Sequence, residues 1–115
     1  LDQTTTIASW LRDAGADLID VSSGGLDPRQ RIALGPGYQV PFAAHIRATT
    51  GMPVAAVGLI TEPAQAEEVI ASGQADAVLL GRQLLREPHF ALRAAHELGA
   101  EIEWPPQYLR ARPGR

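Results

Sequence analysis

The chain has 115 residues, enough for one small domain, and its 45% hydrophobic and 20% charged residues exclude a disordered segment. A net charge of −3 argues against a nucleic-acid partner, which usually requires a clustered basic surface. The sequence has no cysteine and no histidine pair at metal-ligand spacing, so we expect neither thiol chemistry nor a bound metal. It has no membrane-length apolar run and no visible signal peptide, so we expect no membrane partner and a cytoplasmic location.

The first predicted elements are a helix over residues 3–14 and a short buried strand over 17–21. Apolar residues recur in the helix at i, i+3, i+4 and i+7, which is typical of an amphipathic helix: Ile7, Trp10, Leu11 and Ala14. Gly15 is placed to end the helix. We therefore expect Trp10 to pack in the core.

A loop rich in glycine and proline over residues 26–40 separates these elements from the rest of the chain. The pattern then predicts a helix over 41–51, a strand over 53–58, a helix starting at Thr61 or Pro63 and ending at Gly73, a strand over 76–81, and a helix over 90–99. A short helical stretch, "RQLLRE", follows the last strand. Inward-facing residues are predicted in the last two long helices: Ala66, Val69, Ile70, Phe90, Ala94 and Leu98. The final stretch, "WPPQYLRARPGR", is predicted to be an irregular tail.

Strands that alternate with helices predict an α/β fold with a parallel sheet. The segments 15–24 and 73–81 share a helix-ending glycine, an Ala-Asp pair, an apolar strand and a closing glycine, a faint repeat of βα units. Three strands cannot close a barrel, so periodicity leaves open a small open sheet or the closing part of a (β/α)8 barrel. The chain starts at Leu1, already inside the first helix, which leads us to expect a piece of a longer protein.

Glycines follow all three predicted strands, and an arginine follows the last. The strand ends are "SSGG" (22–25), Gly58, and the pair Gly81-Arg82. In parallel α/β folds ligands bind at these ends, where glycine lets them approach the backbone and arginine recognises anions through a bidentate fork. Turn glycines are common, however, and Arg82 could instead pair with Glu87 at the surface. Taken together, the three strand ends favour an anion site, with a phosphate as the best match.

Five blocks of the sequence, in order, resemble one family: "DLIDVSSGG", "GPGYQVPFA", "AVGLIT", "ADAVLLGRQLLREP" and "WPPQYLRA". They are similar to the C-terminal third of the Old Yellow Enzyme family, closest to its bacterial thermophilic-type ene-reductases, the NADPH dehydrogenases. The resemblance runs from residue 1 to about residue 112. It implies that residues 1–103 are the C-terminal portion of an FMN-binding (β/α)8 TIM barrel, contributing its last three βα units, and that residues 104–115 are a C-terminal tail.

The resemblance also implies an activity for the whole protein. NADPH or NADH would reduce the FMN, which would then give hydride to the β-carbon of an activated alkene such as an enone. The protein would be a homo-oligomer. The chain alone is expected to have little or no activity, because it retains chiefly the phosphate end of the cofactor site.

Site residues are carried over by the same resemblance. Gly81 and Arg82 would bind the FMN phosphate, with Gly58 in the neighbouring loop. Ser23, Gly24 and Gly25 would lie beside the flavin. Tyr108 and Arg110 would lie in a tail that reaches the active site of a neighbouring subunit. Arg110 would act there as an arginine finger.

The family's substrate-binding histidine pair and tyrosine proton donor match nothing here, so no catalytic residue is assigned. His45, His89 and His96 are expected at the surface, and Trp104 is expected to dock the tail.

Two other functions fit parts of the pattern. A phosphate-binding barrel enzyme of another class would share Gly58, Gly81 and Arg82 but not the "WPPQYLR" tail. A non-catalytic α/β module that self-associates through its open sheet edges would need none of these residues for chemistry.

Overall fold

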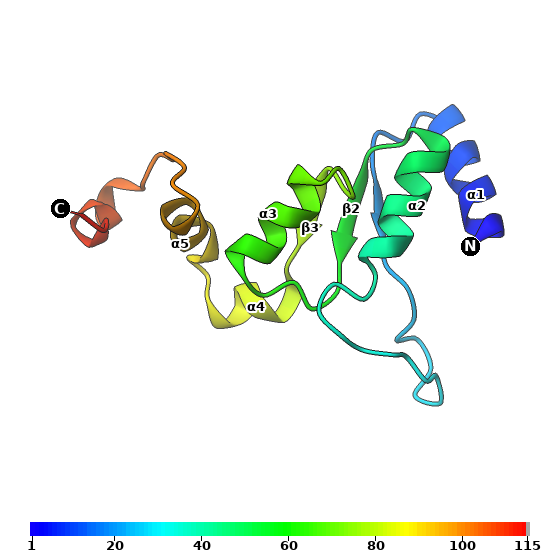
Figure 1. Ribbon diagram of the computed structural model, residues 1–115, viewed down its shortest axis with the longest axis horizontal. Helices are drawn as coiled ribbons and strands as arrows, with labels where there is room; N and C mark the ends of the chain where they lie inside the picture. The colour runs from blue at the N-terminus through cyan, green and yellow to red at the C-terminus, as the bar shows by residue number, and fades with distance from the viewer. Residues whose placement is uncertain (115) are drawn as a thin grey trace.

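The computed structural model describes residues 1–114 and shows an α/β fold around three parallel strands (Figure 1). The strands are β1 (Ile19–Val21), β2 (Val54–Val57) and β3 (Ala77–Leu79), in the spatial order β1-β2-β3. The helices, in chain order, are α1 (Asp2–Asp13), α2 (Val40–Thr50), α3 (Pro63–Ala71), α4 (Gly81–Arg86), α5 (Phe90–Glu97) and the 3₁₀ helix η1 (Pro106–Ala111). The predicted alternation of helices and parallel strands is confirmed.

The core lies on one face of the sheet. The register places Val21, Ala56 and Val78 side by side, and they pack in a single core with residues of α1, α2 and α3. Figure 1 shows α2 and α3 lying in front of the strands. The opposite face carries the row Asp20, Ala55 and Ala77, which contributes nothing to this core.

The molecule exposes more surface than a compact monomer does. Its accessible surface is 7941 Å², whereas a compact protein of 12.3 kDa exposes roughly 6,100 Å². The radius of gyration is 16.5 Å, against about 13 Å for a compact domain of this size. α5 and η1 extend away from the sheet, and the two ends of the chain lie at opposite ends of the long axis (Figure 1). A short parallel sheet with helices packed on one face is consistent with part of a TIM barrel.

The predicted starts and ends of α2 and α3 agree well with the structure. Pro41 lies in the first turn of α2, and Gly51 follows it in the left-handed conformation at φ 68°. α3 begins at Pro63, and Gly73, at φ 74°, follows its last turn. β3 is shorter than the predicted strand because α4 already begins at Gly81.

The expectation that the α1 stripe faces the core is wrong. Trp10 is 66% exposed, and Ile7 and Leu11 are also exposed, whereas Ala8 is the buried residue of this helix. α1 packs against α2, and a small alanine allows the close approach of two helices. Within residues 1–114 no element covers the apolar stripe, so tertiary contact overrides the periodicity.

Three smaller expectations also need correction. Ile70 and Leu98 are exposed, although Val69 and Phe90 are buried as predicted. The tail is not irregular throughout, because Pro106 opens the 3₁₀ helix η1. Short 3₁₀ segments need only i to i+3 hydrogen bonds and have no 3.6-residue apolar period, so hydrophobic periodicity does not detect them.

None of the helices in the described part of the chain is long and apolar enough to cross a bilayer.

Candidate functional site

A pocket of about 240 Å³ opens at the carboxyl ends of β2 and β3. It is lined by the turn after β2, by α4 after β3, and by the end of the long loop that precedes α2. Of the residues predicted for an anion site, Gly58, Gly81 and Arg82 all line this one pocket. The structure therefore brings together the last two strand ends that the sequence singled out.

The turn after β2 has a backbone shape that depends on glycine. Gly58 adopts φ 121°, and a Cβ atom there would lie 2.8 Å from the Tyr38 ring and 2.9 Å from Gln39 Nε2. Gly58 is buried, so glycine is required here by close packing rather than by exposure of its backbone to a ligand. The next residue, Leu59, has φ 52°, which is unfavourable for a residue with a side chain. Strain of this kind tends to persist at binding sites, where the surrounding structure imposes it.

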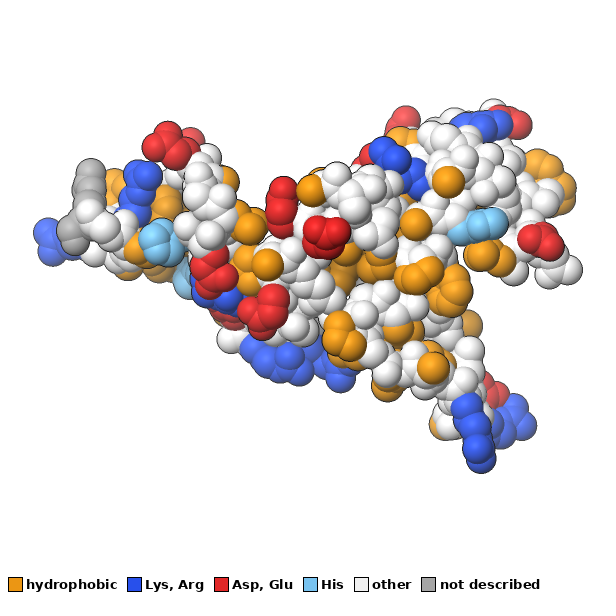
Figure 2. Space-filling view, viewed as in Figure 1, with side chains coloured by type: hydrophobic (Ala, Val, Ile, Leu, Met, Phe, Trp, Pro, Cys, Tyr) orange, Lys and Arg blue, Asp and Glu red, His pale blue; other side chains and the backbone are white. Residues whose placement is uncertain are grey.

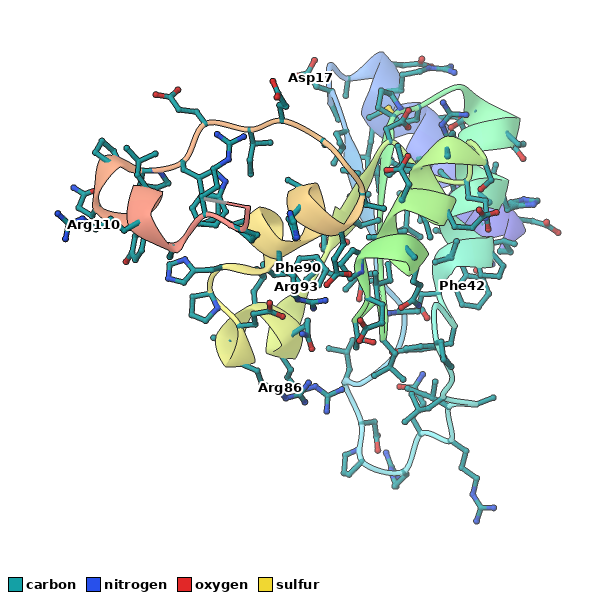
Figure 3. The ribbon with its side chains drawn as sticks, turned by 60° about the vertical axis from the view of Figure 1, so that its left-hand side comes forward. Asp17, Phe42, Arg86, Phe90, Arg93 and Arg110 are labelled. Atoms are coloured by element: carbon teal, nitrogen blue, oxygen red, sulfur yellow. The ribbon has the colours of Figure 1, made fainter. Side chains whose placement is uncertain are left out.

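The other wall of the pocket is basic. Gly81 is exposed, and no atom lies within 4 Å of the position that its Cβ would occupy, so a ligand can approach this backbone closely. Arg82 and Arg86, four residues apart on α4, both line the pocket and are exposed. Basic side chains gather over α4 at the lower edge of the view in Figure 2, and Figure 3 shows Arg86 projecting from this helix.

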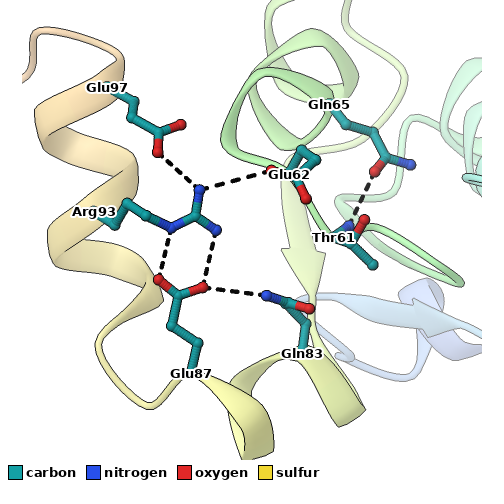
Figure 4. Close-up of polar contacts among 7 residues, drawn as sticks. All are labelled: Thr61, Glu62, Gln65, Gln83, Glu87, Arg93 and Glu97. Carbon is teal, nitrogen blue, oxygen red and sulfur yellow. Dashed lines mark hydrogen bonds and ion pairs between the residues drawn. The ribbon is translucent and has the colours of Figure 1, made fainter.

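The one acidic residue at the end of α4 is held by another arginine. Arg93 donates to both carboxylate oxygens of Glu87, and Gln83 donates to one of them at 3.2 Å (Figure 4). These hydrogen bonds, chiefly those from Arg93, lower the pKa of Glu87 below its ordinary value. The alternative pairing of Arg82 with Glu87 is therefore wrong. Among residues 1–114 no carboxylate forms an ion pair with Arg82 or Arg86, so both guanidinium groups are available to an anion.

The end of β1 lies beside this pocket but does not line it. The Ser23 N–H donates to the Gln39 side chain, whose amide nitrogen in turn donates to the Val57 carbonyl at 3.3 Å. This buried glutamine therefore connects the ends of β1 and β2. Gly25 donates its N–H to Gln30 at 2.8 Å, in the loop that follows.

Gly24 adopts φ 76°, a conformation that favours glycine, and a Cβ there would lie 2.6 Å from the end of the Ile32 side chain, which would have to shift. Ser23, Gly24 and Gly25 thus form the neighbouring strand end, packed against the 26–39 loop.

The tail residues lie elsewhere. Tyr108 stacks at a tilt on His89, with ring centroids 4.7 Å apart, beside a second pocket of about 270 Å³ between α5 and η1. Trp104 lines this second pocket too, as expected for a residue that docks the tail. Arg110 is exposed at the far end of the molecule in Figure 3. The structure does not bring Tyr108 or Arg110 to the first pocket of the same chain.

Comparison with known proteins assigns the family. Residues 3–101 match the family described as "NADH:flavin oxidoreductase / NADH oxidase family". The chain belongs to this family. It is also 56% identical over 100 residues to an NADPH dehydrogenase of Geobacillus thermodenitrificans (strain NG80-2), a match that covers 87% of the chain and 29% of the relative. The chain thus spans less than a third of the length of this curated relative.

Several residues that line the pocket in this flavin oxidoreductase family member were not singled out from the sequence, among them Arg86, Tyr38 and Gln39. Arg86 had a usable signal, because its spacing of four residues from Arg82 puts both on one helix face. Tyr38 and Gln39 had none, since they reach the pocket from a long loop whose path depends on tertiary packing.

The three histidines of this chain are all exposed, as expected. In the described part of the chain, no three His, Cys, Asp or Glu side chains form a group that could hold a metal ion.

Proposed function

We propose that this chain forms part of an FMN-dependent oxidoreductase that uses NADPH or NADH, and that the pocket at β2 and β3 binds the FMN phosphate. The observation that carries the proposal is a pocket at the carboxyl ends of parallel strands that is lined by Arg82 and Arg86, two arginines that pair with no carboxylate of residues 1–114. Membership of a flavin oxidoreductase family supports FMN as the source of the phosphate.

The residues present suit the phosphate end of the cofactor. Guanidinium groups bind phosphate oxygens in pairs, and exposed backbone at Gly81 allows close approach. A pocket of about 240 Å³ is smaller than most sites for whole cofactors, which supports binding of one end only. When bound, FMN would supply the hydride transfer between the nicotinamide and the substrate. Arg82 and Arg86 would hold its charged end and fix its position along the strand ends.

The substrate and assembly belong to the same proposal. We infer an activated alkene, such as an enone, as substrate, and a place for Ser23, Gly24 and Gly25 beside the flavin. The position of these residues at the strand end next to the pocket supports that place. Tyr108 and Arg110 would act on a neighbouring subunit's site in a homo-oligomer. Neither residue lines the pocket of its own chain, and Figure 3 shows Arg110 well away from Arg86, which does, an arrangement compatible with such a role.

The test compares FMN with riboflavin, which lacks the phosphate. In the intact enzyme, Arg82→Ala should weaken FMN binding by roughly ten- to hundredfold, because a hydrogen bond to a charged group contributes about 1.5–3 kcal/mol. Riboflavin binding should change little. Arg29→Ala is the matched control, since Arg29 lies in an exposed loop and its only ion pair in the described part of the chain is with Asp27. Equal weakening of both flavins, or an intact protein without a flavin absorption spectrum, would contradict the proposal.

A further inference from the structure

Gln65, in α3, stabilises the turn after β2 through two side-chain hydrogen bonds. Its side-chain oxygen accepts the Thr61 N–H at 3.0 Å, and its amide nitrogen donates to the Leu59 carbonyl at 2.9 Å. Figure 4 shows the contact with Thr61. Both bonds belong to one planar amide, so they fix the two backbone groups relative to each other. Leu59 is the residue with the unfavourable positive φ, and Gln65 therefore holds the strained part of the turn.

Gln39, directly before α2, stabilises the start of the same turn through hydrogen bonds. Its oxygen accepts the Ser23 N–H, and its amide nitrogen donates to the Val57 carbonyl at 3.3 Å. Gln39 is only 3% exposed, so its polar atoms depend on these partners for hydrogen bonds. Two glutamines thus use the same donor and acceptor arrangement on the carbonyls of residues 57 and 59, directly before and after Gly58.

We propose that Gln39 and Gln65 are positioning residues that preset the turn at residues 57–61 for an anion. This inference rests on the proposed function, in which that turn faces the FMN phosphate. Neither residue needs to touch reacting atoms. Each acts through the backbone, by engaging a carbonyl oxygen whose partial negative charge would otherwise be free to turn toward the phosphate. Only a side chain that donates and accepts at once can make both bonds, and a neutral amide does so without adding charge.

Gln65→Glu separates this role from simple packing because the introduced carboxyl changes with pH. When ionised it accepts from Thr61 but cannot donate to Leu59, and it brings a negative charge toward the anion site. When protonated it both donates and accepts, as the native amide does. We therefore expect the affinity for FMN relative to riboflavin to fall about tenfold at pH 8 and to recover toward the wild-type ratio at about pH 3.5, which is below the ordinary glutamate pKa of about 4.3. The wild type is measured at each pH, because phosphate itself titrates near pH 6.

Gln74→Glu is the matched control. Gln74 lies at the opposite end of the sheet, before β3, where it donates to the Ser72 hydroxyl at 2.7 Å. The same chemical change there should leave the ratio of FMN affinity to riboflavin affinity unchanged at both pH values. Gln65→Leu, which can form neither bond, should lower the ratio at both pH values. If Gln65 only capped the start of α3, its variants would lower stability without changing this ratio.

The intact enzyme carrying Arg82→Ala is measured alongside. If Arg82→Ala lowers the ratio but Gln65→Glu leaves it unchanged, the inference is overturned and the proposed function stands. Equal loss of the affinity ratio at about pH 3.5 and at pH 8 in Gln65→Glu also overturns the inference, because the carboxyl that is protonated at the lower pH should restore both bonds. If Arg82→Ala weakens FMN and riboflavin equally, the proposed function fails and the inference fails with it.

Discussion

Arg93 donates two hydrogen bonds to the Glu87 carboxylate, one of 2.6 Å from Nε to Oε1 and one of 2.9 Å from Nη2 to Oε2. The same guanidinium reaches Glu97 on α5 at 2.8 Å and Glu62, before α3, at 3.7 Å. One side chain therefore joins the end of α4 to both neighbouring helices (Figure 4). This matters for the candidate site because α4 carries Arg82.

Replacement of Glu87 should make stability less sensitive to acid. Hydrogen bonds from Arg93 lower the pKa of Glu87 below its ordinary value of 4.5. An acid with a lowered pKa in the folded state adds stability that is present above its unfolded pKa and is lost as pH falls through the folded pKa. The wild type should thus melt above Glu87→Gln at pH 7, and the difference should shrink below about pH 4.5 and disappear in stronger acid. Thermal unfolding monitored across pH 3 to 8 measures this.

Asp27→Asn is the control for the Glu87 measurement. Hydrogen bonds from Arg29 also lower the pKa of Asp27, but this pair lies within one exposed loop and joins no two elements. Exposed local pairs contribute little to stability. A pH-dependent melting difference as large for Asp27→Asn as for Glu87→Gln would show that the link between helices is unimportant.

Gly58→Ala should be considerably more destabilising than Gly99→Ala. Both glycines have positive φ, at 121° and 69°, so both substitutions force alanine into an unfavourable conformation, which costs about 1–2 kcal/mol. Gly99 has open space around the added methyl, whereas at Gly58 the methyl meets Tyr38 and Gln39. The overlap should add about 1–3 kcal/mol. Chemical denaturation of the intact enzyme, with FMN content measured in parallel, tests the difference, and equal free energies of unfolding would contradict it.

Arg110→Ala should change kinetics without changing the fold. Arg110 is exposed and forms no ion pair within residues 1–114, so its loss should leave melting temperature and FMN content nearly unaltered. If it contacts the substrate in a neighbouring subunit, KM should rise or kcat should fall, by about tenfold for one charge-assisted contact. Steady-state kinetics with an enone measure this.

Mixed oligomers decide whether Arg110 acts between subunits. Arg110→Ala subunits mixed with subunits that are inactive at the flavin site should regain activity, because each supplies what the other lacks. No rescue on mixing, or unchanged kinetics in the single variant, would remove Arg110 from the site.

The isolated chain should self-associate. Leu18 and Leu79, at 46% and 38% exposed, and Trp10 on α1 are apolar surfaces that no described element covers. Soluble monomers rarely leave such areas bare. Light scattering of residues 1–115 should therefore show oligomers or aggregates, and a monodisperse, cooperatively folding monomer would contradict this expectation.

The sequence by itself determined the order of elements and the glycines at their ends. Helix and strand periods are local, and residues such as Pro41, Gly51 and Pro63 act on the backbone beside them, so their signals are readable without the fold. Gly58, Gly81 and Arg82 could be placed at strand ends for the same reason. Parallel strands then required those ends to meet at one edge of the sheet.

Only the tertiary structure decided which polar groups serve the site. Arg82 and Glu87 were plausible partners along the chain, but Arg93 binds the carboxylate because the turn from α4 into α5 brings the two side chains together. Trp10 carries the apolar pattern of a core residue, yet burial depends on which elements are present to cover it. Gln39 gave no signal at all, because its role depends on two strand ends and a long loop converging on one side chain, and such long-range contacts are not encoded in any local pattern.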